Sequence, residues 1–450
     1  MTARPSTPGT GAGPSDSTTA SITVASATAI GVGGMMGAGL YTLIGMASTT
    51  AGPWVPLAFV VGGFVSVFSI YSYAKLGARF PSRGGAAQFL IRSFGDGVIA
   101  GGLNIFQFLG WIIAMALYAA GFAGYARDLL PWETPDWSAK VIGIGLVALV
   151  VVVNLIGTKL VGRAELVVVV IELTILGGFV VAGFFHADPG HFGAGGGDGW
   201  IGVLFAAGLL YVTYEGFGVV ANSAGSMANP AKELPRAMYL ALGIVVVVYV
   251  VVSAVVVLVL PHAEIAANEG HVLAEAGEAV LGRVGFVAVG AAALLATASG
   301  VNATMFGDAN LAFTVARSGE LPKVFARGIW LGGKGALFGA ALLTSAFVLF
   351  FPLAAVGQMA SLAFLLVYGV VSVGHLRVRH ETGAKAGLLV VAIVLNLALF
   401  LLLLGYTIRT GPATTWITLV AVFGLSFVVE IVYRRATGRR LVLEATSAPS

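Results

Sequence analysis

The sequence predicts an all-α integral membrane protein with about twelve transmembrane helices. Of its 450 residues, 58% are hydrophobic and 10% are charged, whereas soluble domains carry about 25% charged residues. Apolar runs long enough for helices of about 20 residues recur along nearly the whole chain. Glycines and acids interrupt a few of these runs at membrane depth, where an irregular backbone or a charge survives only beside a protein-enclosed cavity or a partner.

The apolar runs between polar breaks give the expected spans, with approximate boundaries. In chain order they cover residues 22–48, 53–76, 97–129, 140–156, 165–185, 200–227, 238–260, 284–315, 336–351, 353–374, 386–407 and 414–433. The segment 261–282 contains four glutamates and two histidines, so it is too polar to span. It is expected to be an external loop with a short surface helix.

The chain ends and the basic residues predict the orientation. Residues 1–20, rich in Ser, Thr, Pro and Gly, are expected to form a disordered cytoplasmic tail, and residues 436–450 a second cytoplasmic tail. If the N-terminus is cytoplasmic, 20 of the 24 lysines and arginines lie on the cytoplasmic side, where basic loops concentrate. The bias predicts that both termini lie inside and that the number of spans is even.

The first span is predicted to be broken in its middle. Two glycines flank a small residue at Gly37, Ala38 and Gly39, which favours an unwound segment because glycine tolerates almost any backbone conformation. Half-helix ends at membrane depth present free backbone groups to a solute, as in many transporters. The alternative is close helix packing through small residues four apart, such as Gly33 and Gly37.

The sixth span shows a second interruption. Glu215 lies directly before Gly216 and near Gly218 in an otherwise apolar run. A carboxylate at this depth is costly unless it faces a cavity or a partner, so Glu215 is a candidate functional residue. The alternative is a protonated carboxyl that is hydrogen-bonded between helices. Paired interruptions in two spans also indicate an inverted repeat with the site between them.

Two further spans carry polar groups that need a partner. Glu172 lies in the fifth span with apolar residues on both sides, too deep to reach either surface, so it is a pathway candidate or a neutral acid bonded to a neighbouring helix. The eighth span holds a dense polar run, some of which must line a pathway or bind an ion. Its members are Thr297, Ser299, Asn302, Thr304 and Asp308.

Other classes of function lack the residues they require. The chain has no cysteine, which excludes a disulfide-linked subunit. Its six histidines lie at span ends or in loops, so no metal site is expected. No phosphate-binding loop and no nucleophile with an adjacent base are visible, which leaves an enzyme or a resident cofactor without support. The pI near 9.3 follows from basic cytoplasmic loops and does not indicate nucleic-acid binding.

Three motifs resemble those of the amino acid/polyamine/organocation transporter superfamily, and the resemblance covers residues 23 to about 435. They are Gly-Met-Met-Gly-Ala-Gly-Leu at 34–40; Tyr-Glu-Gly-Phe at 214–217 with Asn-Pro-Ala-Lys-Glu-Leu-Pro-Arg-Ala at 229–237; and Ala-Ser-Gly-Val-Asn-Ala-Thr at 298–304 with Ala-Arg-Ser-Gly-Glu-Leu-Pro at 316–322. The resemblance implies a five-plus-five inverted repeat in a domain of residues 21–435. The first repeat would cover 21–187, the second 199–376, and two additional helices 386–433.

The resemblance also implies a substrate site between the broken first and sixth spans. The amides of Gly37, Ala38 and Gly39 would hold a substrate carboxylate, and the carbonyl of Met35 would help to hold its amine. The turn of the sixth span would complete the amine site through Val212, Tyr214, Glu215 and Gly216. The chain departs from the family in two ways. Many relatives carry an acid at the position of Gly218, whereas this chain carries it at Glu215. Sodium-independent relatives often carry a lysine in the fifth span, where this chain has Glu172.

We therefore expect a multi-pass permease of the cell membrane that transports amino acids by alternating access. Small neutral or apolar amino acids are favoured because Met35, Met36, Val212 and Phe217 make the site apolar. Coupling to protons is expected in preference to sodium, with Glu172, Ser299 and Asp308 as the coupling residues. The alternatives are an amine or polyamine transporter, an amino acid exchanger, a membrane nutrient sensor that does not transport, and a channel.

Overall fold

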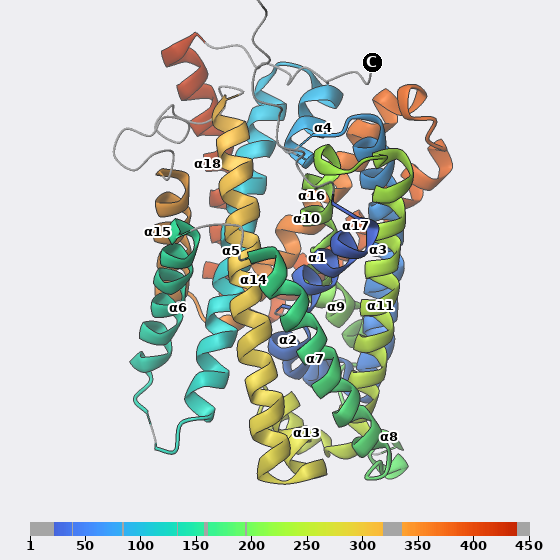
Figure 1. Cartoon of the computed structure of the whole chain (residues 1–450), viewed down its shortest axis with the longest axis vertical. Coiled ribbons are helices and arrows are strands. Elements are labelled where there is room, and N and C mark those ends of the chain that lie inside the picture. The colour runs from blue at the N-terminus through green and yellow to red at the C-terminus, as the bar shows by residue number, and fades with distance from the viewer. Residues whose placement is uncertain are drawn as a thin grey trace, which may run out of the picture.

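The structure is a computed structural model that describes residues 22–37, 39–82, 85–132, 134–156, 161–193, 196–317 and 335–438. For residues 161–165, 193, 306 and 308–317 it describes the backbone alone. The predicted tail at 1–20 and nearly all of the tail at 436–450 lie outside these ranges. The regular structure of the described residues is entirely helical, which confirms the all-α part of the predicted fold class (Figure 1).

The helices follow one another with short connections. The first half of the chain contains α1 (Val24–Met36), α2 (Gly39–Ala51), η1 (Gly52–Trp54), α3 (Val55–Arg79), α4 (Gly85–Phe94), α5 (Val98–Asp128), α6 (Trp137–Ile156), α7 (Val161–Phe184) and α8 (Pro189–Gly193). The second half contains α9 (Gly199–Leu209), η2 (Leu210–Tyr214), α10 (Phe217–Asn222), η3 (Ala224–Ser226), α11 (Pro230–Val259), α12 (His262–Ala267), α13 (Val272–Leu281), α14 (Arg283–Arg317), α15 (Gly335–Phe350), α16 (Leu353–Thr382), α17 (Ala386–Thr410) and α18 (Ala413–Thr437).

The predicted spans all coincide with helices. Among the described residues, ten helical stretches are long and apolar enough to cross a membrane, and α1 and α15 are shorter apolar helices. The first span consists of α1 and α2, and the sixth of α9, η2, α10 and η3. The division into inverted repeats at 21–187 and 199–376, followed by the two helices of 386–433, stays a prediction.

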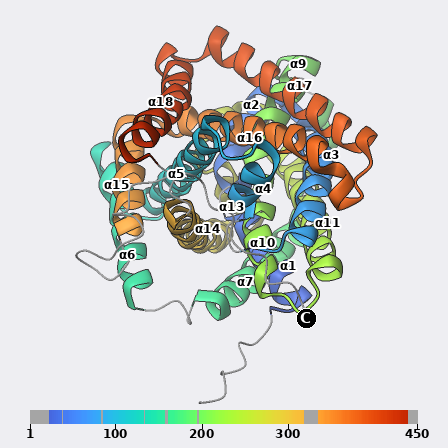
Figure 2. The same ribbon diagram turned by 90° about the horizontal axis from the view of Figure 1, so that it is seen from above.

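The helices differ sharply in burial, which separates a core from a lipid-facing shell. In their most apolar windows, the stretch Gly199–Ser226 is 89% buried and α5 is 83% buried, whereas α6 is 28% and α18 is 22% buried. The view along the bundle places α6, α15, α17 and α18 at the periphery (Figure 2). The sixth span therefore lies inside the bundle, and it is also less apolar than the lipid-facing helices: its mean hydropathy is 1.6, against 2.5 for α6 and 2.1 for α18.

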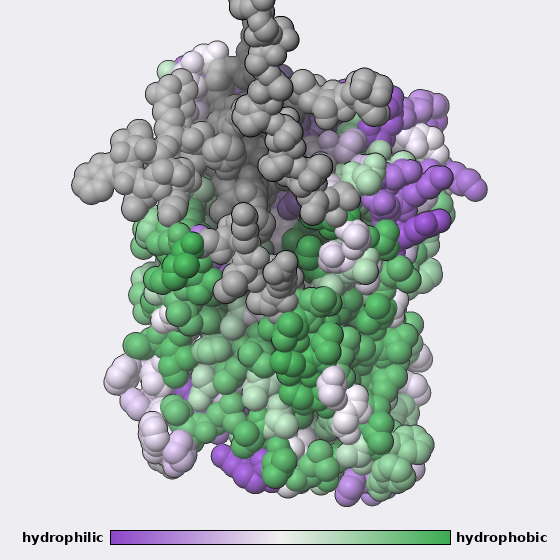
Figure 3. Space-filling model, viewed as in Figure 1, coloured by the Kyte–Doolittle hydropathy of each residue, from purple (hydrophilic) through white to green (hydrophobic). Residues whose placement is uncertain are grey.

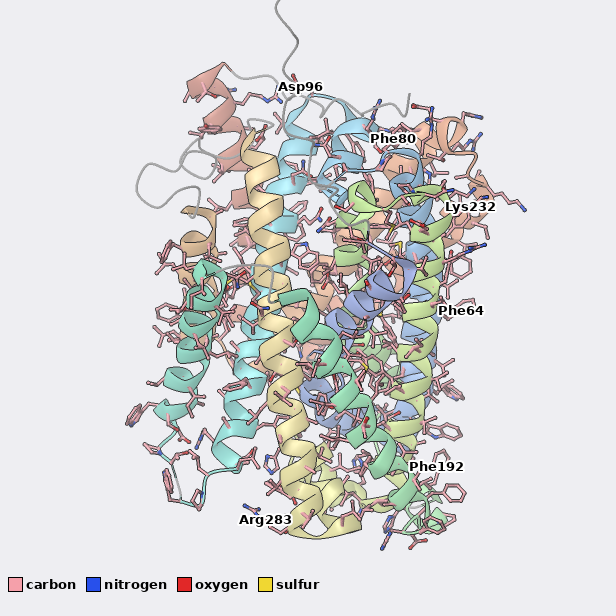
Figure 4. The ribbon with its side chains drawn as sticks, viewed as in Figure 1. Phe64, Phe80, Asp96, Phe192, Lys232 and Arg283 are labelled. Atoms are coloured by element: carbon pink, nitrogen blue, oxygen red, sulfur yellow. The ribbon has the colours of Figure 1, made fainter. Side chains whose placement is uncertain are left out.

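The surface has the apolar belt that a bilayer requires. Hydrophobic residues cover most of the visible middle of the molecule, and hydrophilic residues gather toward the ends (Figure 3). Asp96 and Lys232 lie near one end and Arg283 near the other, while Phe64 of α3 projects outward between them (Figure 4). Phe64 is 56% exposed, which suits a side chain in contact with lipid tails.

The polar segment 261–282 forms two helices rather than the single short surface helix expected. α13 buries an apolar stripe that includes Val272, Leu273 and Ala276, so it packs into the end of the bundle instead of lying on it. Between α12 and α13, the ring of His271 bridges two acids: Nδ1 lies 2.8 Å from Asp128 of α5, and Nε2 lies 3.2 Å from Glu275. This cluster ties α13 to the end of α5.

We expect the fold to lose part of its stability as the pH rises through the pKa of His271. Partial burial lowers the pKa of this imidazole, but the hydrogen bond and charge of Asp128 and the interaction with Glu275 outweigh that effect, so the pKa lies above its ordinary value. A raised folded-state pKa means that the contribution is complete below the ordinary histidine pKa of about 6.5 and is lost above the folded-state pKa.

Thermal unfolding of the detergent-solubilised protein between about pH 5.5 and 9 measures this effect. The difference in midpoint between the wild type and His271→Gln should be largest at the acid end and shrink as the pH rises. A difference that is constant across this range would contradict the expectation.

Candidate functional site

The first break lies between α1 and α2. The amide of Gly37 closes the last turn of α1 by donating to the carbonyl of Gly33 at 3.0 Å, and α2 begins at Gly39. Ala38, a predicted carboxylate-binding residue, lies outside the described residues. In any α-helix, the first amides and the last carbonyls have no partner within the helix. The last carbonyls of α1 and the first amides of α2 come together at this point, inside the bundle.

The second break runs from Leu210 to Gly216 in the sixth span. Here the backbone forms the tighter turns of η2, with the amide of Glu215 donating to the carbonyl of Val212 at 3.1 Å. The hydroxyl of Ser361 in α16 accepts from the amide of Val212 at 3.1 Å and donates to the carbonyl of Leu209. A side chain from another helix thus satisfies backbone groups that the change in winding leaves without partners.

The two breaks touch through glycines. A Cβ atom built on Gly216 would lie 2.4 Å from the amide nitrogen of Met35, and one built on Gly39 would lie 2.0 Å from Cβ of Thr213. One built on Gly37 would lie 2.8 Å from Cα of Gly300 in α14. The sequence analysis treated a broken helix and close packing through small residues as alternatives. In the structure the two occur together.

Tyr249 of α11 joins both breaks, and the sequence analysis missed it. Its hydroxyl lies 2.6 Å from the carbonyl oxygen of Met35 and 3.2 Å from that of Thr213. The side chain is fully buried. The available signal was a single tyrosine within the valine-rich run 244–252, because a phenol at membrane depth needs a polar partner.

Tyr214 and Val212, both predicted in the substrate site, are buried at the second break. The hydroxyl of Tyr214 is directed to α3, where it donates to the carbonyl of Phe59 at 2.7 Å. Its ring lies 5.5 Å from that of Tyr249, centroid to centroid. Tyr214 therefore supports the Tyr249 ring in this structure, and its hydroxyl is engaged outside the two breaks.

Glu215 is buried on the side of the break that faces α16. The hydroxyl of Tyr368 lies 3.4 Å from Oε1 of Glu215 and 3.3 Å from its backbone carbonyl. Only 1% of the Glu215 surface is exposed. The Trp111 ring approaches the same place, since a Cβ atom on Gly218 would lie 3.2 Å from Oε1 of Glu215 and 3.4 Å from this ring. Tyr368 and Trp111 were not among the predicted site residues.

Glu172 of α7 is 99% buried close to the first break, with 1% of its surface exposed. Its carboxyl group interacts electrostatically with the phenols of Tyr41 in α2 and Tyr249 in α11. Ser299 is partly buried and precedes Gly300, which contacts Gly37. The backbone of Asp308 continues α14 two turns further on, and its side chain is outside the described part of the chain.

The structure thus brings together the predicted residues of the first and sixth spans, with Glu172 beside them through Tyr249. Among the described residues, no three His, Asp or Glu side chains are grouped so that they could hold a metal ion. The arrangement offers convergent carbonyls, helix-end amides and two buried acids, which suits a small zwitterionic solute.

Comparison with known proteins adds independent findings. A family model described as amino acid permease matches residues 22–428. An uncharacterized protein of Methanocaldococcus jannaschii is 33% identical over 92% of this chain and 95% of its own length. The inner membrane transport protein YbaT of Escherichia coli is 30% identical over 90% of this chain and 94% of its own length. The methylthioribose transporter of Bacillus subtilis is 23% identical, with coverages of 91% and 92%.

Proposed function

The chain belongs to the amino acid permease family, and from this premise we propose that it is a secondary active transporter of amino acids, coupled to protons and working by alternating access. One relative is named for methylthioribose, so the substrate class has to be argued from the site. The observation that carries the proposal is the meeting of two broken helices at the carbonyls of Met35 and Thr213.

An amino acid fits the chemistry of this meeting point. The N-terminus of α2 offers amides and the positive end of a helix dipole to the substrate carboxylate. The C-terminal carbonyls of α1 and those of η2 offer acceptors to the substrate ammonium. Both halves of a zwitterion would therefore find complementary groups on the two sides of the break after Met36.

Alternating access requires two halves that rock around this point. In the proposed arrangement, residues 21–187 and 199–376 are inverted repeats, and 386–433 are two additional helices at the periphery. In the proposed orientation both termini lie in the cytoplasm and α13 lies on the opposite side of the membrane, as the concentration of lysines and arginines in alternate loops favours.

Glu172 is the proposed proton-coupling residue, with Ser299 and Asp308 as its partners in α14. A charge at membrane depth is costly, so the acid would carry a proton until a conformational change opens it to water. Sodium would need several hard oxygen ligands, and the neighbours Ile171 and Leu173 offer none from their side chains.

Uptake of a labelled amino acid panel into proteoliposomes, with imposed proton or sodium gradients, tests the proposal. Accumulation driven by a proton gradient supports the proposal, whereas accumulation driven only by a sodium gradient would make sodium the coupling ion. Uptake that needs amino acid on the opposite side identifies an exchanger. Binding without uptake identifies a sensor. Competition by polyamines and not by amino acids identifies a polyamine transporter.

We expect the affinities of neutral amino acids for Glu215→Gln to stay within about threefold of wild type. An isosteric neutral amide should change their binding free energy by less than about 0.7 kcal/mol. This follows if Glu215 is a neutral acid beside Tyr368. Competition assays in proteoliposomes measure it. Strong competition by cationic amino acids in the wild type that disappears in the variant would instead make Glu215 an ionised specificity residue.

A further inference from the structure

The hydroxyl group of Tyr249 lies between the two broken helices. It projects from α11 and is fully buried, so its hydroxyl needs a partner within the protein. It finds two: the carbonyl oxygen of Met35 at 2.6 Å and that of Thr213 at 3.2 Å. These carbonyls come from different breaks and converge on a single atom of a third helix.

Both carbonyls lie where the helical winding is interrupted. An unbroken helix would give Met35 the amide of Gly39, but α1 ends at Met36 and Gly39 begins α2. Thr213 lies in η2, where the winding changes. The single hydroxyl hydrogen of Tyr249 is shared between these two carbonyls, with the Met35 oxygen the nearer acceptor.

A phenol is a poor match for two convergent carbonyls. It carries one hydrogen to donate, whereas a primary ammonium carries three and a positive charge, and hydrogen bonds from a charged donor are roughly twice as strong. Building on the proposed amino acid site, we propose that the Tyr249 hydroxyl is the resident occupant of the amine subsite, and that the substrate ammonium displaces it. Tyr249 is then a specificity residue, since solutes without an amine cannot displace it.

Two aromatic rings and one acid lie near the Tyr249 ring. The ring of Tyr249 lies 5.0 Å from that of Phe59 and 5.5 Å from that of Tyr214, centroid to centroid. Glu172 interacts electrostatically with the phenol, and we propose its carboxyl group as the acceptor of the displaced hydroxyl. Displacement would therefore change the environment of Glu172 whenever an amine occupies the site.

The test is Tyr249→Phe in the full-length protein, with binding of an amino acid and of the matching carboxylic acid without the amine measured in detergent. Removing the hydroxyl leaves the empty carbonyls without their partner and removes the competitor of the ammonium. We expect the amino acid Kd to fall about 5- to 10-fold, as loss of one hydrogen bond in the empty state predicts, and the Kd of the amine-free acid to stay unchanged.

Tyr125→Phe is the matched control, because it removes another fully buried tyrosine hydroxyl that donates to a backbone carbonyl, that of Tyr41 at 3.0 Å, and not to the carbonyls of the breaks. It should leave both Kd values at the wild-type level. An unchanged or higher amino acid Kd in Tyr249→Phe would overturn the displacement while leaving the transporter proposal intact. A wild-type protein that binds no amino acid would overturn both.

If Tyr249→Phe does not fold, fluorotyrosine at position 249 gives the same answer by ¹⁹F NMR. Amino acid binding should shift its resonance, and the amine-free acid at the same occupancy should not. Fluorotyrosine at position 125 serves as the control. Equal shifts at position 249 with both ligands would contradict the proposal.

Discussion

Gly39→Ala is expected to reduce uptake by about 10- to 100-fold, since overpacking at a close contact costs about 1–3 kcal/mol. A Cβ atom at this position would lie 2.0 Å from Cβ of Thr213 and 2.7 Å from its Cα. Backbone atoms cannot rotate away as the end of a flexible side chain can. The substitution would therefore force α2 and η2 apart at the point where both contribute to the proposed substrate site.

Uptake into proteoliposomes at matched protein levels measures the effect, and size-exclusion profiles in detergent monitor folding. Gly178→Ala in α7 is the matched control, because a Cβ atom there meets no atom within 4 Å. Thr213→Gly added to Gly39→Ala removes the nearest side-chain atoms and should restore part of the uptake. Wild-type uptake by Gly39→Ala would show that the contact between the breaks has no part in transport.

Glu172→Gln is expected to abolish accumulation while leaving exchange at the wild-type level. The amide mimics an acid that never releases its proton, so the carrier can still alternate with substrate bound but cannot use a proton gradient. Glu172 is 1% exposed and interacts electrostatically with Tyr41 and Tyr249, and glutamine has nearly the same volume. The pH dependence of net uptake should flatten in the same variant.

Counterflow exchange and gradient-driven uptake in the same proteoliposomes separate the two activities. Glu430→Gln provides a control with another fully buried acid, which in α18 pairs with Arg434 and is remote from the breaks. That variant should keep pH-dependent accumulation even if its stability falls. Accumulation that survives Glu172→Gln would move the coupling role to Glu215 or Asp308.

The sequence by itself was sufficient for the spans and for both breaks. The cost of placing a residue in hydrocarbon and the freedom of a glycine backbone are properties of a short segment. They do not depend on what packs against it. The predicted interruption at Gly37 and Gly39 and the buried acids Glu172 and Glu215 follow from such local terms.

Tertiary structure alone decided which groups meet. Tyr249 and Met35 are 214 residues apart, Tyr368 and Glu215 are 153 residues apart, and no periodicity in either segment indicates these pairs. Tyr214 belongs to a predicted motif, yet its hydroxyl turns to Phe59 of α3. The reason is that a buried hydroxyl bonds to whichever carbonyl the packing of a third helix brings within reach, and that packing depends on the whole bundle.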